Sequence, residues 1–361
     1  MKMKLILENK MEFEGTSFGF NQEVAGEVVF NTSMNGYQEI ITDPASSGQI
    51  LVMTSPLIGN YGINLDDSES DQTYIKALVV SEQCIHPNNF RCELTLDDYL
   101  KSQKIMGIEG IDTRALTKVL RTEGTMKGII VSQDNESKSS IEAKFKESVE
   151  SSYTSEIAHA NEAFNDLDFV KKDGSVNLSV VDFGLTNSTL QKFKEMNCQI
   201  KIYPSTAKAS EILLGSPDIV LLSSGSENIE QSPQVLEEIK LLAQSKPLVG
   251  IGNGHLLIAK AFGGKLTKHL YGHRGKQPVK NLLSGKVSSS TQNHSYHVSE
   301  LPQDFEVTHI NLNDNSIEGI KHKTLPVMSV QFYPESHTSS NFCDGMINEF
   351  LKLAHKEMNH A

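Results

Sequence analysis

The second half of the chain, from residue 177 onward, alternates short apolar runs with amphipathic stretches. Four apolar runs of strand length predict buried strands: 178–183, 199–203, 219–222 and 248–251. Four stretches with apolar residues at helical spacing predict helices: 188–196, 210–214, 235–244 and 255–262. This βα repetition is typical of an α/β protein with a parallel sheet and helices on both faces. We also expect a strand-rich stretch over 265–331 and a final helix over 344–356.

Residues 1 to about 130 follow a different pattern, in which short strands and Gly-rich turns are mixed with two helical stretches. One helix is predicted to start at Thr95, and the other to follow residues 112–114. The first residues of the chain favour a β-strand, because their apolar stretch is too short for a signal peptide. We therefore expect a mixed α/β domain over 1–131, a connecting segment over 132–176 rich in Ser, Glu, Lys and Asn, and a second domain over 177–361.

Composition excludes several classes of function. The formal net charge of −12 argues against nucleic acid and against an anionic membrane surface as partners. No apolar run is long enough for a transmembrane helix, so no membrane association is expected. The four cysteines lack metal-like spacing, which favours a reduced, cytoplasmic protein. His294 and His297 are three residues apart, but no third ligand is evident, so we expect no metal site.

The segment 248–255 predicts an unusual site. Its sequence, Leu-Val-Gly-Ile-Gly-Asn-Gly-His, indicates a buried strand, a Gly-rich turn and the start of a helix. This is the pattern of a nucleophile elbow, in which a Ser or Cys is held at the tip of a strained turn. The tip residue here is Gly252, which has no side chain that could attack a substrate. The tip and the turn at 223–225 are both expected at the carboxyl ends of parallel strands, where ligands bind in such sheets.

Motifs along nearly the whole chain carry a resemblance to one family. In the first half they lie at 26–39, 56–62, 89–91 and 110–117. In the second half they lie at 181–184, 272–275, 278–280, 291–294 and 311–314. In this order they resemble the small chain of carbamoyl-phosphate synthase. The resemblance implies an N-terminal domain of its own type and a class I glutamine amidotransferase domain with a flavodoxin-like parallel sheet.

The resemblance also implies an activity and a partner. In the family, the small chain hydrolyses glutamine and passes ammonia through a tunnel to a large chain. The large chain uses ATP to build carbamoyl phosphate, which feeds arginine and pyrimidine synthesis. No cofactor is therefore expected in this chain, since ATP would be bound by the large chain. A higher oligomer of such heterodimers is compatible with the resemblance.

The catalytic positions implied by the resemblance are altered. The family uses a Cys nucleophile, a His base and a Glu that orients the His. At the matching positions this chain has Gly252, Tyr333 and Glu335. A phenol with an ordinary pKa of roughly 10 is protonated near neutral pH and is a poor general base. Glu335 is retained without an imidazole to orient, so we predict that glutamine hydrolysis is absent.

Positions of the glutamine pocket implied by the resemblance differ as well. Ala45 replaces a Ser, Glu227 a Gly, Leu256 a Gln and Ser295 a Gly, and Asn253 follows the tip where a backbone N–H helps form the oxyanion hole. Glu227 brings bulk and negative charge to a place that needs close backbone approach. The other pocket positions keep the family's residue or remain as remnants of the pocket: Gly225, Asn293 and Tyr296.

Three functional hypotheses follow. The leading one is a small chain without glutaminase activity that docks on a large chain, the assembly using free ammonia; the motifs at 26–39 and 56–62 are largely intact beside the altered site. The alternative is a non-catalytic regulatory paralogue that binds a large chain or another partner, or a ligand in the altered pocket, where Glu227 would favour a cationic group. The third, a working glutaminase with a rebuilt site, requires a nucleophile that the sequence does not offer at the tip.

Overall fold

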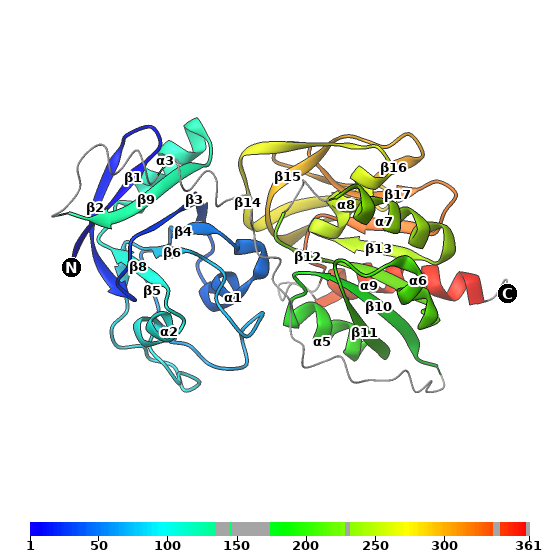
Figure 1. The fold of residues 1–361 in the computed structure, drawn as a ribbon, viewed down its shortest axis with the longest axis horizontal. Coiled ribbons are helices and arrows are strands. Elements are labelled where there is room, and N and C mark those ends of the chain that lie inside the picture. The colour runs from blue at the N-terminus through cyan, green and yellow to red at the C-terminus, as the bar shows by residue number, and fades with distance from the viewer. Residues whose placement is uncertain (134–144, 146–173, 228–231, 335–339, 359–361) are drawn as a thin grey trace. The chain divides into compact units, whose positions relative to one another are not determined.

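The computed structural model in Figure 1 describes residues 1–133, 145, 174–227, 232–334 and 340–358. Most of the predicted connecting segment 132–176 and the whole of Glu335 lie outside these residues. The described residues fall into two compact units. The first comprises those within 1–156 together with 270–274, and the second those within 157–269 and 275–361. No helix among the described residues is long and apolar enough to cross a membrane.

The first unit is built on a closed barrel of seven strands (Figure 1). Around the barrel the strands are β1 (Lys2–Leu7), β2 (Glu12–Gly19), β8 (Met106–Glu109), β6 (Ala77–Val79), β4 (Gln49–Met53), β3 (Val24–Asn31) and β9 (Met126–Ser132). The pairs β3–β4, β4–β6 and β6–β8 are parallel, and β1–β2, β2–β8, β3–β9 and β1–β9 are antiparallel. The predicted strand at the start of the chain is confirmed as β1.

The barrel has an apolar interior and an apolar outer face, because alternate residues of a strand point to opposite sides. On β4, Ile50 and Val52 join the interior cluster, which α3 (Thr113–Glu123) completes, whereas Leu51 and Met53 pack outward. The outward residues meet α1 (Tyr37–Thr42) and α2 (Leu96–Ser102). Both predicted helices are confirmed. The short elements η1 (Pro44–Ser46), β5 (Leu57–Ile58) and β7 (Glu82–Gln83) complete the unit.

The second unit contains a sheet of nine strands. Their order is β11 (Cys198–Pro204), β10 (Val176–Phe183), β12 (Ile219–Gly225), β13 (Leu248–Ile251), β18 (Val327–Val330), β17 (Ile317–His322), β15 (Val287–Glu300), β14 (Lys265–Asn281) and β16 (Phe305–Asn311). The five strands from β11 to β18 are parallel to one another. The predicted parallel sheet, the strand at 248–251 and the strand-rich region after residue 265 are confirmed.

Helices cover both faces of the parallel part of this sheet. One face packs against α5 (Asn187–Glu195) and α9 (Ser340–Met358), and the other against α6 (Ala209–Leu214), α7 (Pro233–Ser245) and α8 (Asn253–Ala261). Strand β12 serves both, since Leu221 lies in the first cluster and Leu222 in the second. This arrangement confirms the predicted α/β class and places the turn between β13 and α8 at the carboxyl edge of the sheet.

Candidate functional site

The turn between β13 and α8 has the backbone of a nucleophile elbow. Gly252 joins the strand to the helix with φ 55° and ψ −112°, a combination that residues with a side chain rarely adopt. Its N–H donates to the carbonyl oxygen of Val330 at 2.9 Å, and its own carbonyl accepts from the N–H of His255 at 3.1 Å. The predicted strand, tight turn and helix are therefore present, with a glycine at the tip.

Glycines on either side of the tip let the strand and the helix touch. A Cβ atom on Gly250 would lie 2.7 Å from the carbonyl carbon of Gly254, and one on Gly254 would overlap the carbonyl oxygen of Leu222. Glycine is thus required at both positions for steric reasons. The tip is less crowded, because a Cβ atom on Gly252 would lie 3.2 Å from the Cβ atom of Ser224.

The two altered catalytic positions lie next to each other. A Cβ atom on Gly252 would be 3.8 Å from Cε1 of Tyr333, which follows β18 by three residues. The backbone N–H of Tyr333 donates to the carbonyl oxygen of Thr291 at 3.0 Å, which fixes the chain at that point. The structure therefore brings together the tip and the position of the missing base. Glu335, the third predicted member, lies outside the described residues.

Sequence reasoning missed one hydroxyl beside the tip, that of Ser224. This residue is the penultimate one of the fully buried strand β12 and is 1% exposed, and its Oγ donates to the carbonyl oxygen of Gly184 at 3.4 Å. An activated serine needs a base within hydrogen-bond reach, and among the described residues Ser224 forms no hydrogen bond with an imidazole. The sequence predicted that the turn at 223–225 shares an edge of the sheet with the tip, but the contact of Ser224 with the tip became visible only in the pairing of β12 with β13.

The nearest histidine along the chain, His255, does not supply that base. It is fully buried in the first turn of α8, and its Nδ1 lies 2.9 Å from Oγ of Ser329 on β18. Burial lowers the pKa of His255 to about 3, because desolvation disfavours the charged ring. A base of such low pKa accepts a proton poorly at neutral pH, so the ring holds the helix to the sheet.

The turn after β12 is shaped by Ser223 and Gly225. Oγ of Ser223 accepts the N–H of Phe183 at 2.9 Å and donates to the carbonyl of Ser224 at 2.8 Å. Gly225 has a φ of 139°, and a Cβ atom there would overlap the carbonyl oxygen of Phe183 on the neighbouring strand. A glycine is therefore needed at Gly225, and the chain leaves the sheet toward Glu227.

Glu227 binds two successive backbone N–H groups of β15. One carboxylate oxygen accepts the N–H of Ser295 at 2.6 Å, and the other accepts the N–H of Tyr296 at 3.1 Å. The carbonyl of Tyr296 is in turn 2.9 Å from Nδ1 of His294. The sequence predicted bulk and charge at Glu227 but not these partners, because backbone donors leave no mark in the sequence. The structure thus joins three of the predicted pocket positions.

The remaining predicted pocket positions have different surroundings within their own units. Asn253 begins α8 at 3% exposure, and neither side-chain atom has a hydrogen-bond partner among the described residues. Leu256 is fully buried in the apolar cluster between α8, α7 and the sheet. Asn293 is half-buried on β15. Ala45 belongs to the first unit, where its N–H donates to Oδ1 of Asp43 at 2.9 Å.

His294 and His297, for which the sequence predicted no metal site, both lie near the ring of His269. The ring of His297 lies 4.1 Å from that of His269, centroid to centroid, and the ring of His294 lies 5.6 Å from it. Both ring nitrogens of His294 meet protein oxygens, at 2.9 Å from the carbonyl of Tyr296 and 3.0 Å from Oε1 of Gln292. The absence of a metal remains a prediction.

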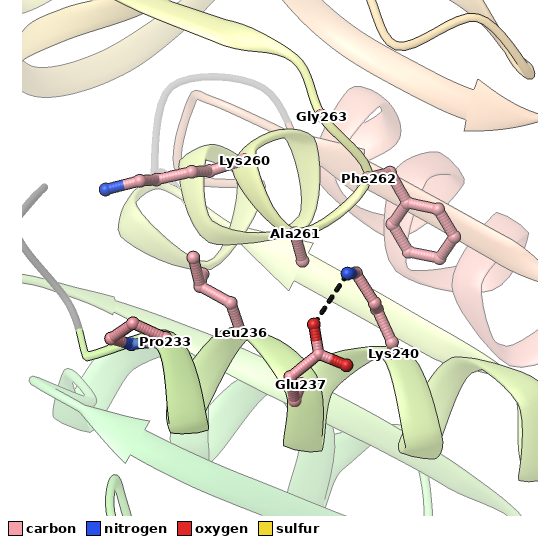
Figure 2. A pocket seen from close by; sticks show the side chains of 8 residues that line it. All are labelled: Pro233, Leu236, Glu237, Lys240, Lys260, Ala261, Phe262 and Gly263. Carbon is pink, nitrogen blue, oxygen red and sulfur yellow. Dashed lines mark hydrogen bonds and ion pairs between the residues drawn. The ribbon is translucent and has the colours of Figure 1, made fainter.

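A surface groove of about 480 Å³ lies between α7 and α8, away from the elbow. Figure 2 shows its lining: Pro233, Leu236, Glu237, Lys240, Lys260, Ala261, Phe262 and Gly263. Glu237 and Lys240 form an ion pair at 2.7 Å. The groove adjoins the C-terminal end of α8, whereas the elbow is at its N-terminal end; at 1.5 Å per residue the helix separates the two by about 13 Å. The groove therefore does not include the elbow.

Comparison with known proteins assigns the class of the chain. Residues 179–353 match the family model "Glutamine amidotransferase class-I", and residues 5–130 match "Carbamoyl-phosphate synthase small chain, CPSase domain". The fold and the elbow thus define a protein with a class I glutamine amidotransferase domain. A solved glutamine amidotransferase from Thermotoga maritima is similar at a TM-score of 0.36 and 17% identity, covering 51% of this chain and 85% of that chain.

Sequence relatives are similar over the full length. The chain is 45% identical over 355 residues to the carbamoyl phosphate synthase small chain of Clostridium perfringens, covering 98% of this chain and 100% of that protein. It is 41% identical to the pyrimidine-specific small chain of Bacillus subtilis, covering 98% and 96%. The chain belongs to the family of carbamoyl phosphate synthase small chains, which confirms the resemblance and the predicted fold class.

Proposed function

We propose that this chain is the small subunit of a carbamoyl-phosphate synthase that takes its nitrogen from free ammonia. It docks on a large chain, which binds ATP, and itself needs no cofactor. The assembly works in the cytoplasm, and its product supplies arginine and pyrimidine synthesis. The observation that carries the proposal is the elbow, whose strained backbone is intact while its tip is Gly252 and its neighbour is Tyr333.

The chemistry supports loss of the glutaminase. Amide hydrolysis through a covalent intermediate needs a nucleophile at the tip and a base beside it. In a comparable hydrolytic triad, removing the nucleophile alone costs roughly six orders of magnitude in turnover. The nearby hydroxyl of Ser224 is buried and bonded to a backbone carbonyl, and His255 is bonded to Ser329. Neither group completes a nucleophile and base pair.

The surface of the first unit supports docking. Two segments that carry β5 and β7 lie side by side, with the N–H of Asn88 donating to the carbonyl of Asn60 at 3.0 Å. These segments expose large apolar side chains: Leu57, Leu65, Ile85, Phe90 and Leu94. Phe90 is 97% exposed. Large apolar side chains at the surface favour a protein partner, and we take these two paired segments, called the 57–94 patch, as the site of docking.

The loop that presents Phe90 is held in place by charge. Nη2 of Arg91 lies 2.8 Å from Oδ1 of Asp67 and 3.4 Å from Oδ2 of Asp66. Its Nη1 donates to Oδ2 of Asp67 at 3.1 Å, so the guanidinium binds that carboxylate at both oxygens. An exposed aromatic ring on a loop fixed in this way loses little conformational freedom on binding, which suits a docking contact.

The test is formation of carbamoyl phosphate by the co-purified small and large chains, with glutamine or ammonium chloride as the nitrogen donor. We expect product from ammonium chloride and none above background from glutamine. Product from glutamine at a comparable rate would overturn the proposal. Failure of the two chains to co-purify would instead favour the non-catalytic regulatory paralogue. The mass of the purified complex also shows whether heterodimers assemble further.

A matched pair of variants locates the docking surface. Phe90→Ala, on the 57–94 patch, is expected to reduce co-purification with the large chain at least ten-fold. Leu214→Ala removes an apolar side chain of the second unit that is 85% exposed, and is expected to leave co-purification unchanged. Equal behaviour of the two variants would exclude the 57–94 patch as the docking site.

A further inference from the structure

The carboxylate of Glu227 is bound to β15 in the way that the carboxylate of a bound ligand would be. Both oxygens of a single carboxylate are used, one on the N–H of Ser295 and the other on the N–H of Tyr296. Charge-assisted bonds from backbone N–H groups to a carboxylate are among the stronger hydrogen bonds in proteins. Ser295 and Tyr296 are 68 and 69 positions from Glu227 in the sequence, so only the fold brings the carboxylate to the two N–H groups.

The two donors are arranged as an anion site. In a regular strand successive N–H groups point to opposite sides, because the residues alternate. Two successive N–H groups that meet one carboxylate therefore depart from the regular pleat and resemble the anion-binding nests formed by consecutive backbone N–H groups. A further contact stabilises the peptide that carries these donors, since Nδ1 of His294 lies 2.9 Å from the carbonyl oxygen of Tyr296.

The position of this anion site agrees with that of a ligand pocket. Glu227 follows Gly225, the last residue of β12, by two residues, and Ser224 of the same turn is next to the elbow tip. Ligands of open α/β sheets bind at the carboxyl ends of the strands. A small molecule held by Ser295 and Tyr296 through its carboxylate would thus lie at the edge of the sheet that carries the elbow.

We propose that Glu227 acts as an internal ligand, whose carboxylate occupies the N–H groups of Ser295 and Tyr296 in the place of a ligand's carboxylate. The side chain closes the pocket to free α-amino acids. A tethered group competes at an effective concentration in the millimolar range or above, so a weakly bound amino acid cannot displace it. The inference deepens the proposed function, on which it rests: the pocket beside the inactive elbow is filled as well as inactive.

The experiment measures binding of L-glutamine to the full-length chain by titration calorimetry. We expect Glu227→Gly and Glu227→Ala to bind L-glutamine at least ten-fold more tightly than the unmodified chain. The α-amide of glutamine, which lacks the carboxylate, should show no such gain. Glu300→Ala is the control, because Glu300 lies on β15, the strand of the two donors, but pairs with Lys265 at the surface. This variant should bind L-glutamine as the unmodified chain does.

Several outcomes would overturn the inference. If neither Glu227 variant gains affinity although each melts cooperatively, Glu227 is a structural clamp and no subsite exists. If the unmodified chain already binds as tightly as the variants, the side chain blocks nothing. Should the Gly and Ala variants fail to fold, Glu227→Gln keeps the size and removes the charge, and a gain of at least three-fold is then required. Binding is measured without the large chain, so failure here leaves the ammonia assay of the complex intact.

Discussion

Two tight backbone junctions, the contact between Tyr37 and Tyr61 in the first unit and the elbow in the second, differ in what fixes their backbone. In the first unit, Tyr37 and Tyr61 stack at 4.2 Å between ring centroids, and the hydroxyl of Tyr61 accepts the N–H groups of Gly36 and Tyr37 at 2.9 and 3.0 Å. In the second unit, Gly250 and Gly254 preserve the elbow around a tip that carries no reactive group. Hydrogen bonds and ring stacking thus fix the backbone of the first junction, whereas close contacts of glycines fix the second, whose tip has no side chain.

The comparison changes the meaning of the motifs at 26–39 and 56–62. Their tyrosines bind each other, and the hydroxyl of Tyr37 also donates to the carbonyl of Gly62 at 2.5 Å. Packing within the first unit therefore accounts for the two tyrosines of these motifs. The exposed 57–94 patch is more direct support for docking, because its apolar side chains do not serve the core.

The largest effect is expected where the elbow depends on the absence of a side chain. Gly254→Ala places a Cβ atom against the carbonyl oxygen of Leu222, and overpacking of this kind should cost about 3 kcal/mol of unfolding free energy. Gly345→Ala, in α9, meets nothing within 4 Å and should stabilise by about 0.5–1 kcal/mol. Urea unfolding checks both. Equal effects would mean that the elbow does not depend on its glycine.

The next effect concerns the tyrosine junction of the first unit. Tyr61→Phe removes the acceptor of two backbone N–H groups and should cost about 1–3 kcal/mol of unfolding free energy. Tyr203→Phe is the matched change in the second unit, where the buried hydroxyl has no hydrogen-bond partner among the described residues. It should change stability by less than about 0.5 kcal/mol. Thermal unfolding of the two variants would show the contrast, and a larger loss in Tyr203→Phe would contradict it.

A third change tests the tip itself. Gly252→Cys puts a side chain on a residue with φ 55° and brings its Cβ atom to 3.2 Å from that of Ser224. Strained backbone of this kind should cost about 1–3 kcal/mol, without restoring glutamine hydrolysis, because Tyr333 remains beside it. Chemical unfolding and an ammonia-release assay measure the two effects. A Cys variant more stable than the unmodified chain would refute the idea that glycine relieves strain here.

The last effect is a gradual dependence of the unfolding free energy on pH in the second unit. Burial lowers the pKa of His255 to about 3 and that of His309 to about 4, below the ordinary value of 6.5. Below about pH 6.5 the unfolded chain takes up protons that the folded chain refuses, so stability is full above this pH and falls toward pH 4. Each ring should contribute a slope of about 1.4 kcal/mol per pH unit.

Variants of single histidines separate this slope from that of other groups. His309→Asn should reduce the slope of the unfolding free energy between about pH 6.5 and about pH 5 by an amount equivalent to roughly one proton. His86→Asn, at an exposed histidine of the first unit, should leave it unchanged. An unaltered slope in His309→Asn would show that the buried ring is protonated in the folded chain.

The sequence was sufficient to predict the parallel part of the sheet in the second unit, but neither the antiparallel part of that sheet nor the barrel. The parallel sheet follows from local periodicity, and the strand at 248–251 was predicted with the bounds of β13. Closure of the barrel joins β1 to β9, more than a hundred residues away, through register that no local pattern encodes. The sequence therefore predicted strands and helices in the first unit without their arrangement.

At the site, the sequence could predict which side chains are present or missing, but not which groups the fold brings into contact. The missing side chain of Gly252 is visible in the sequence, and the resemblance supplied its pairing with Tyr333. Sequence reasoning placed the turn at 223–225 at the same edge of the sheet as the tip, but not the contact of Ser224 with it, because the order of the strands was not predicted. It could not find the partners of Glu227 either, since the donors are backbone groups common to every residue. The boundaries of the three predicted segments and the roles of the site residues stay predictions.

The closed barrel also limits how another protein can recognise the first unit. An open sheet presents an edge strand whose unpaired N–H and C=O groups can recruit a further strand from a partner. In the barrel each of the seven strands has a neighbour on both sides, so it cannot be extended by strand addition. Recognition at the barrel therefore depends on side-chain identity, and partner choice in this unit can change through point substitutions on its loops without any change to the barrel.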